Sequence, residues 1–211
     1  MQQLVKQINQ LKDSEVGKRI AQRLSEFHQF QTAAKTSQDW FCEFCFCLLT
    51  ANAKSKTACA VQQDLGFSGF ATASFDELVS VIRKNKHRFH NTKAKYILAA
   101  REYLNIREKV LLHKTEQDMR EWLVANIKGY GYKEASHFLR NVGFLNLAIL
   151  DRHVLNHLFE HKIIREIPST LHQKNYLKME KKMEQLCAAV KMTQAELDMY
   201  LWYMKAGDVL K

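Results

Sequence analysis

Apolar residues recur along this chain at the three- and four-residue spacing of amphipathic helices. In residues 15–35 the positions with this spacing are Val16, Ile20, Leu24 and Phe27. The run from about 38 to 51 is apolar on nearly every side, which predicts a helix buried in the centre of the protein. Two longer stretches, 92–108 and 171–190, also carry a helical pattern.

Three further helices are predicted from their start signals. Ser74 followed by Glu77 forms a capping-box pattern, in which the carboxylate reaches back to the N–H of the cap. Thr193 with Glu196 repeats this pattern, and residues 115–118 form a weaker version. These signals predict helices over about 75–84, 194–206 and 116–126.

The fold class follows from these helices and from the scarcity of turn residues. One proline and seven glycines in 211 residues leave few positions for the tight turns of an all-β fold. The proline lies in the loop around 164–169, which is the clearest break in the helical pattern. We therefore predict an all-α protein of about nine or ten helices, packed as two lobes.

The net charge favours an anionic partner. The chain has 32 basic and 22 acidic residues, a formal charge of +10, which suits a nucleic acid more than a membrane surface. On charge alone, a basic protein with no such partner is an equal alternative. No apolar run is long enough to span a membrane, and the N-terminus lacks the apolar segment of a signal peptide. We expect an intracellular protein without a membrane partner, associated with the nucleoid in a prokaryotic cell.

The five cysteines do not predict a metal site. Cys42, Cys45 and Cys47 lie close together but inside a nearly continuous apolar run, where cysteine is a small hydrophobic residue. A structural zinc site needs about four ligands in loops or turns. We expect reduced thiols, no metal and no cofactor.

A short glycine-spaced connection joins two amphipathic helices within residues 115–142. Gly129 and Gly131 let the backbone approach a phosphate, because glycine takes positive φ freely and has no Cβ. The N–H groups that open the second helix are expected to be free and to attract an anion. This helix-hairpin-helix pattern predicts phosphate binding by Lys128, Gly129, Gly131 and Lys133.

Lys133 and Asp151 are the candidate catalytic residues. Lys133 lies in the first turn of the second helix, where the helix dipole disfavours a charged amine and so favours a nucleophile. A solvated lysine that contacts a phosphate is an equally good interpretation from the residue alone. Asp151 precedes an amphipathic helix and is expected to cap it, with a carboxylate suited to stabilising positive charge on a sugar. The alternative for Asp151 is a helix cap with no further role.

Residues 129–143, Gly-Tyr-Gly-Tyr-Lys-Glu-Ala-Ser-His-Phe-Leu-Arg-Asn-Val-Gly, followed by Leu-Asp-Arg-His-Val-Leu at 150–155, resemble the helix-hairpin-helix DNA glycosylases. More narrowly, they resemble the archaeal-type 8-oxoguanine DNA glycosylase/lyase family. Segments 44–52 and 88–94 and the ending at Lys211 are also similar to that family, so the resemblance covers about residues 37–211.

The resemblance implies a fold of two helical lobes with the active site in the cleft between them. One lobe would span about residues 37–150, and the other would combine about 1–36 with 151–211. Lys133 would attack C1′ of the damaged nucleotide and form a Schiff base, and Asp151 would stabilise the oxocarbenium-like transition state. Strand cleavage by β-elimination would follow.

The resemblance also implies a base pocket. Phe89 and Trp202 would stack on the flipped base, Lys211 would distinguish 8-oxoguanine from guanine, and Asn52 would fill the gap left in the duplex. For the two aromatic residues, core packing is the alternative interpretation. The partner would be double-stranded DNA containing 8-oxoguanine, and we expect a monomer.

Two departures and two alternative functions accompany this interpretation. The family pattern has proline before the first glycine, where this chain has Lys128. The cysteine spacing that holds an iron–sulfur cluster in the endonuclease III branch does not occur near the C-terminus. A non-catalytic helix-hairpin-helix module is disfavoured because both Lys133 and Asp151 are present. A related glycosylase with another lesion preference is disfavoured less strongly, by the pocket residues.

Overall fold

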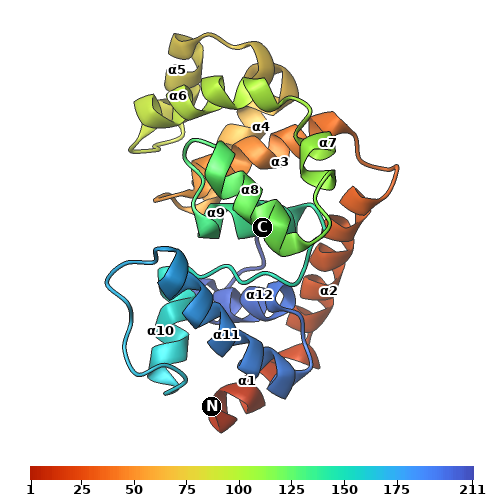
Figure 1. Cartoon of the computed structure of the whole chain (residues 1–211), viewed down its shortest axis with the longest axis vertical. Coiled ribbons are helices and arrows are strands. Elements are labelled where there is room, and N and C mark those ends of the chain that lie inside the picture. The colour runs from red at the N-terminus through yellow and green to blue at the C-terminus, as the bar shows by residue number, and fades with distance from the viewer.

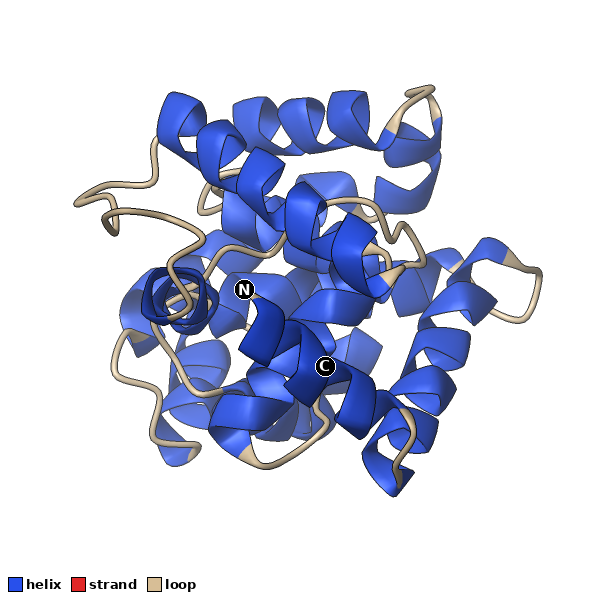
Figure 2. Ribbon diagram, turned by 90° about the horizontal axis from the view of Figure 1, so that it is seen from below, coloured by secondary structure: helices blue, strands red, loops and turns tan.

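A computed structural model describes all 211 residues and contains helices joined by loops, without a strand (Figure 2). The twelve α-helices are α1 (Gln2–Lys12), α2 (Glu15–His28), α3 (Ser37–Thr50), α4 (Ser55–Thr72), α5 (Phe75–Lys84), α6 (His90–Ala100), α7 (Ile106–Leu111), α8 (Glu116–Asn126), α9 (Tyr132–Asn141), α10 (Arg152–Glu160), α11 (Gln173–Val190) and α12 (Gln194–Ala206). Short 3-10 helices cover Gln29–Gln31 and Arg101–Tyr103. The all-α prediction is confirmed, but the expected nine or ten helices were too few.

The start signals located their helices correctly. Ser74 and Glu77 exchange both capping hydrogen bonds at the start of α5, and Thr115 and Thr193 each accept one N–H at the starts of α8 and α12. The predicted helix over 92–108 was wrong, because the chain turns between Ala100 and Ile106 and forms α6 and α7. The helix expected over 15–35 ends at His28 and continues only as one turn of 3-10 helix.

The buried apolar residues form two separate clusters. The α3 core contains 29 residues between Phe30 and Leu147, and α3 at its centre packs against α4, α7 and α9. The α12 core contains 23 residues from α1, α2, α9 to α12 and the segments beside them. In Figure 1 the helices of the α3 core occupy the upper part and those of the α12 core the lower part. The boundaries predicted for the two lobes stay a prediction.

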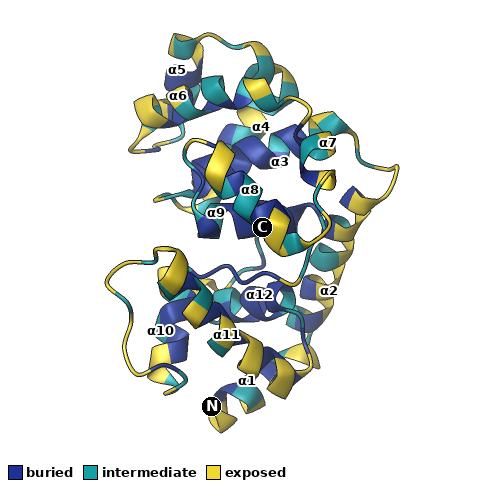
Figure 3. Cartoon of the chain, viewed as in Figure 1, coloured by how far each residue is buried: buried dark blue, intermediate teal, exposed yellow.

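The central helix α3 is buried as its sequence predicted. Cys45 and Cys47 are fully buried in it and Cys42 is half-buried. Its ribbon is dark blue over most of its length in Figure 3, whereas the outer faces of α1 and α11 are largely exposed. No group of three or more His, Cys, Asp or Glu side chains is placed to hold a metal ion. None of the helices is both long and apolar enough to cross a membrane.

The chain passes between the two cores close to the candidate site. It enters the α3 core between Phe27 and Phe30 and returns to the α12 core between Leu147 and Ala148, three residues before Asp151. Tyr130 packs in the α3 core while Tyr132 packs in the α12 core. The hairpin therefore spans both cores, and the residue that follows it, Lys133, lies where they meet.

Candidate active site

The hairpin between α8 and α9 needs glycine at its first position. Gly129 has φ +95°, and a Cβ there would lie 2.5 Å from the ring of Tyr96. Gly131 has an ordinary extended backbone, so positive φ is not its reason. Its N–H donates to the Glu134 carboxylate at 3.2 Å. The expectation that the N–H groups opening this helix are all free was therefore wrong, because Glu134 accepts one of them.

Lys133 is the second residue of α9 and remains accessible. Its side chain is 28% exposed, and its Nζ lies 3.4 Å from Oε1 of Glu134. Glu134 thus contacts both the hairpin backbone and the amine. Lys133 lines two adjoining hollows of the protein, a small pocket and a large cleft.

Asp151 caps α10, as its position before an amphipathic helix predicted. Its Oδ1 accepts the N–H groups of His153 and Val154 at 2.8 and 2.9 Å. Oδ2 accepts neither of these bonds and is available to a ligand. Asp151 also lines both hollows, so the structure brings Asp151 and Lys133 to one pocket wall.

The small pocket has a volume of about 80 Å³ and is built by both cores. Its lining residues are Thr50, Ala53, Ser55, Lys133, His137, Arg140, Ile149, Asp151, Asp198, Met199, Trp202, Val209, Leu210 and Lys211. The adjoining cleft of about 1290 Å³ also carries Asn52, Lys54, Lys86, Arg88 and Arg152. Its cationic lining suits a polyanion.

Two of the predicted pocket residues come from the C-terminal end of the chain. Trp202 is half-buried on the pocket wall. Its ring is edge-on to that of His153, and the two ring centroids are 5.4 Å apart. The Nζ of Lys211 donates to Glu43 at 2.5 Å and to Gln62 at 2.7 Å. These two bonds fix the amine of Lys211 on the pocket wall.

Phe89 is not in the pocket. It is 43% exposed at the start of α6, edge-on to His87 and under the guanidinium of Arg88. It lines neither the pocket nor the cleft, although its neighbour Arg88 lines the cleft. The structure therefore does not bring Phe89 against Trp202, but its exposure rules out core packing.

Asn52 lies on the cleft, in a turn with φ +60° that follows α3. Two backbone carbonyl oxygens at the end of α3 form hydrogen bonds with buried side chains. Nζ of Lys93 donates to the carbonyl of Leu48 at 2.5 Å, and Nε2 of His87 lies 2.9 Å from the carbonyl oxygen of Leu49. Burial lowers the pKa of Lys93 to about 8. These contacts fix the turn that carries Asn52. Lys128 is exposed in the hairpin.

Sequence reasoning missed three ionisable residues on the pocket wall, His137, Arg140 and Asp198. His137 and Arg140 follow Lys133 on α9 at spacings of four and seven, which place all three on one face. Arg140 donates to Asp198 of α12 at 2.6 Å. Burial, opposed by Arg140 and reinforced by the negative charge of Asp151, raises the pKa of Asp198 to about 7. The helical spacing could have identified His137 and Arg140, but nothing local pointed to Asp198.

Comparison with known proteins identifies what the chain is similar to. A family model described as 8-oxoguanine DNA glycosylase matches residues 20–192. The 8-oxoguanine DNA glycosylase/AP lyase of Methanocaldococcus jannaschii is 44% identical over 208 residues, which are 99% of both chains. The protein of the same name from Thermotoga maritima is 37% identical over 211 residues and the full length of both.

Solved structures agree with these relatives. The M. jannaschii 8-oxoguanine glycosylase/lyase in complex with 15mer DNA containing 8-oxoguanine matches with a TM-score of 0.95 and 43% identity. That match covers 99% of this chain and 100% of the other. The 8-oxoguanine DNA glycosylase of T. maritima matches with a TM-score of 0.93 and 36% identity, over 100% of this chain and 99% of the other.

Proposed function

Because this chain belongs to the 8-oxoguanine DNA glycosylase family, we propose that it excises 8-oxoguanine from duplex DNA and then cleaves the strand. One observation carries the proposal. One wall of the pocket carries an accessible amine, that of Lys133, and the carboxylate of Asp151, which caps α10. The pocket lies beside a cleft with a cationic lining. This is the arrangement that attack on a sugar carbon requires: a nucleophile, an anion for the developing positive charge and a groove for the polyanion.

Base release begins with the unprotonated amine of Lys133. The N9–C1′ bond breaks and its electron pair leaves with the base, a new C1′–N bond forms to Nζ, and one amine proton passes to the departing base. The free Oδ2 of Asp151 stabilises the positive charge that develops on the sugar during this exchange, since its other oxygen is fixed by α10. Fixing one oxygen reduces the reorganisation that the carboxylate needs in the transition state.

Strand cleavage follows from the covalent sugar. Opening of the sugar ring converts the C1′–N bond to an iminium ion, a protonated Schiff base. The iminium makes the C2′ proton acidic, so its removal expels the 3′ phosphate oxygen and breaks the strand by β-elimination. Water then hydrolyses the imine and returns Lys133 as an amine, which completes the cycle without a cofactor or metal.

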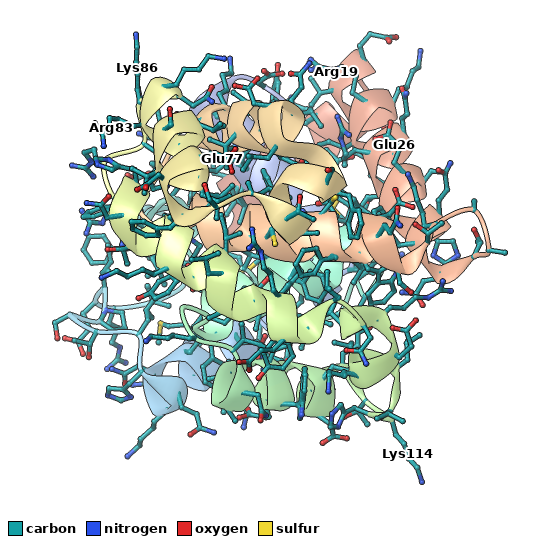
Figure 4. The ribbon with its side chains drawn as sticks, turned by 90° about the horizontal axis from the view of Figure 1, so that it is seen from above. Arg19, Glu26, Glu77, Arg83, Lys86 and Lys114 are labelled. Atoms are coloured by element: carbon teal, nitrogen blue, oxygen red, sulfur yellow. The ribbon has the colours of Figure 1, made fainter.

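The cleft and the hairpin hold the DNA. Lys54, Lys86 and Arg88 lie on the α3-core side of the cleft and Arg152 on the other. Backbone phosphates would bind here and at the exposed Lys128 and Gly129 of the hairpin, with Gly131 and Lys133 at the start of α9. Lys86 extends outward from the end of α5 and is free to reach a phosphate (Figure 4).

The remaining pocket residues recognise the base. Trp202 offers a stacking surface on the pocket wall, and Phe89 would complete the sandwich by moving from its exposed position when DNA binds. Lys211 would help to distinguish 8-oxoguanine from guanine, from a position that its bonds to Glu43 and Gln62 fix. Asn52 would fill the gap in the duplex. One chain supplies all these residues, so we propose that a monomer acts on the DNA, at the nucleoid in a prokaryotic cell.

The two alternative functions make different demands on the pocket. A non-catalytic DNA-binding module needs the hairpin but no amine and carboxylate in a shared pocket. A glycosylase for another lesion would use the same Lys133 and Asp151, and would differ in the base-contacting residues. The shared pocket favours a glycosylase over the non-catalytic module, and substrate competition separates the second alternative from the proposal.

Borohydride reduction of a reacting mixture tests the proposal. The protein is incubated with duplex DNA containing 8-oxoguanine opposite cytosine, and reduction should trap a covalent complex. Lys133→Gln should abolish trapping and excision, and Asp151→Asn should slow excision by about 10²–10⁴-fold. Lys114→Gln is the matched control, since Lys114 is exposed and lies outside the pocket and the cleft (Figure 4). Failure of the unaltered protein to form any adduct would overturn the lyase mechanism.

A further inference from the structure

His137 is a buried histidine with an unused hydrogen-bonding atom at the active-site pocket. It lies one helical turn after Lys133 on α9 and lines the pocket, yet is only 7% exposed. Its ring packs edge-on against the ring of Phe46, with the two centroids 5.8 Å apart. Its buried Nε2 atom has no hydrogen-bond partner in the protein.

An unpaired buried nitrogen is unfavourable in the free protein. Such a group has given up its hydrogen bonds to water on folding and has gained none in the protein. The neighbouring polar groups on α9 do not share this condition, because Arg140 bonds to both Asp198 and Asn141, and Asn141 bonds to Glu43. A polar ligand that enters the pocket would supply the missing partner.

The charge state of His137 limits what the ligand can be. Burial and the nearby positive charges of Arg140, Lys133 and Lys211 hold the pKa of His137 well below its usual range. The ring is therefore neutral at pH 7, with one nitrogen as donor and the other as acceptor. A neutral ring matches an uncharged polar ligand such as a base, whereas a phosphate would favour a cation.

We infer that His137 is a base-contacting residue, whose Nε2 forms a hydrogen bond with the edge of the flipped 8-oxoguanine. This rests on the proposed function. The oxidised purine presents the O6 and O8 acceptors and an N7–H donor, whereas guanine has an acceptor at N7. A neutral imidazole pairs with either kind of group on the oxidised edge. The contact exists only while the base is in the pocket, so it contributes to base release and not to the later cleavage of the strand.

Two substrates separate this role from a structural one. The first is duplex DNA with 8-oxoguanine opposite cytosine, and the second is the same duplex with a preformed abasic site. His137→Phe keeps a flat ring against Phe46 but removes both nitrogens. It should slow excision by about 10- to 100-fold in single-turnover reactions, because a polar contact to the base is lost. Cleavage of the abasic duplex should be unchanged.

His137→Gln is the matched variant, since its amide nitrogen can reach the position of Nε2 and should restore part of the excision rate. Equal loss of both reactions in the two variants would mean that His137 only supports Lys133, and would overturn the inference. Unchanged excision in His137→Phe would overturn it as well. Failure of the unaltered protein to cleave or trap the abasic duplex is a different result, which would count against the proposed function.

Discussion

Two buried arginine–carboxylate pairs connect the hairpin region to the C-terminal helices, and they differ in how completely their carboxylates are bonded. Arg120 of α8 forms two hydrogen bonds to Glu180 of α11, at 2.6 and 2.8 Å. Arg140 of α9 forms one bond to Asp198 of α12 and gives its other donors to Asn141. Both guanidinium groups are almost inaccessible to water.

The Arg120–Glu180 pair lies outside the pocket and the cleft and is surrounded by further contacts. The guanidinium carbon of Arg120 lies 5.2 and 5.7 Å from the ring centroids of Tyr132 and Tyr176. Glu180 also accepts a hydrogen bond from the N–H of Ala148. Burial alone would lower the pKa of Arg120, but the hydrogen bonds and charge of Glu180 raise it. A pair with this many partners is well suited to fix the segment that leads to Asp151.

The Arg140–Asp198 pair borders the pocket and has fewer partners. The Asp198 carboxylate accepts one hydrogen bond, from Arg140, and burial raises its pKa to about 7 despite this arginine. The contrast teaches that the two carboxylates differ: both oxygens of Glu180 are bonded in the pair beside the segment that leads to Asp151. The pair on the pocket wall keeps a carboxyl group that changes charge near neutral pH.

Removal of Glu180 should have the largest effect on stability. Glu180→Ala leaves the Arg120 charge buried without a partner, which should lower the free energy of unfolding by about 3–5 kcal/mol. Urea unfolding measures the change. Glu180→Gln keeps the shape and an acceptor for Ala148, so its loss should be smaller. If Glu180→Ala unfolds at the same urea concentration as the unaltered protein, the pair does not hold the two regions together.

Substitution of Asp198 should have an intermediate and pH-dependent effect. Its pKa in the folded protein is about 7 against an ordinary value of 3.8, so between these values the folded state binds more protons than the unfolded state. The carboxyl group therefore lowers the free energy of unfolding as the pH rises through this window. Asp198→Asn should remove this pH-dependent loss of stability, which is about 3 kcal/mol between pH 4 and pH 7.

Urea unfolding of both proteins at several pH values checks the Asp198 prediction. The unaltered protein should lose more stability between pH 4 and pH 7 than Asp198→Asn does. Identical slopes would show that Asp198 is not the group that titrates, and a steeper slope in the variant would reverse the assignment.

The smallest effect is expected at Ser136, whose buried hydroxyl accepts a hydrogen bond from Arg120 at 3.3 Å. Ser136→Ala removes one of several partners of the guanidinium and should cost about 0.5–1.5 kcal/mol. Thermal or urea unfolding measures this change in the free energy of unfolding. A loss as large as that of Glu180→Ala would mean that the extra contacts around Arg120, and not its ion pair, provide the stability.

The sequence predicted those parts of the fold that depend on local chemistry. The capping residues Ser74, Thr115 and Thr193 located three helices, because a cap satisfies backbone groups within a few residues. Helices α1 and α4 were not predicted. The backbone of α4 is interrupted by Gly66 at φ +55°, which breaks the periodic pattern of a single long helix.

The candidate site was predictable only where its residues follow a local pattern. Lys133 and Asp151 stand at helix starts, and their spacing within a resemblance to a family identified them together. Asp198 and His137 gain their properties from burial beside residues distant in the sequence, which no local pattern reports. The exposed position of Phe89 likewise depends on how α6 packs, whereas the resemblance implied that Phe89 stacks on the flipped base.

The identity of the trapped lysine tests the central claim most directly. The unaltered protein is reduced with borohydride while it reacts with duplex DNA that contains 8-oxoguanine opposite cytosine, digested, and analysed by peptide mass spectrometry. The account predicts that the sugar remnant is attached to Lys133. Attachment to another lysine near the pocket, such as Lys93 or Lys54, would contradict it.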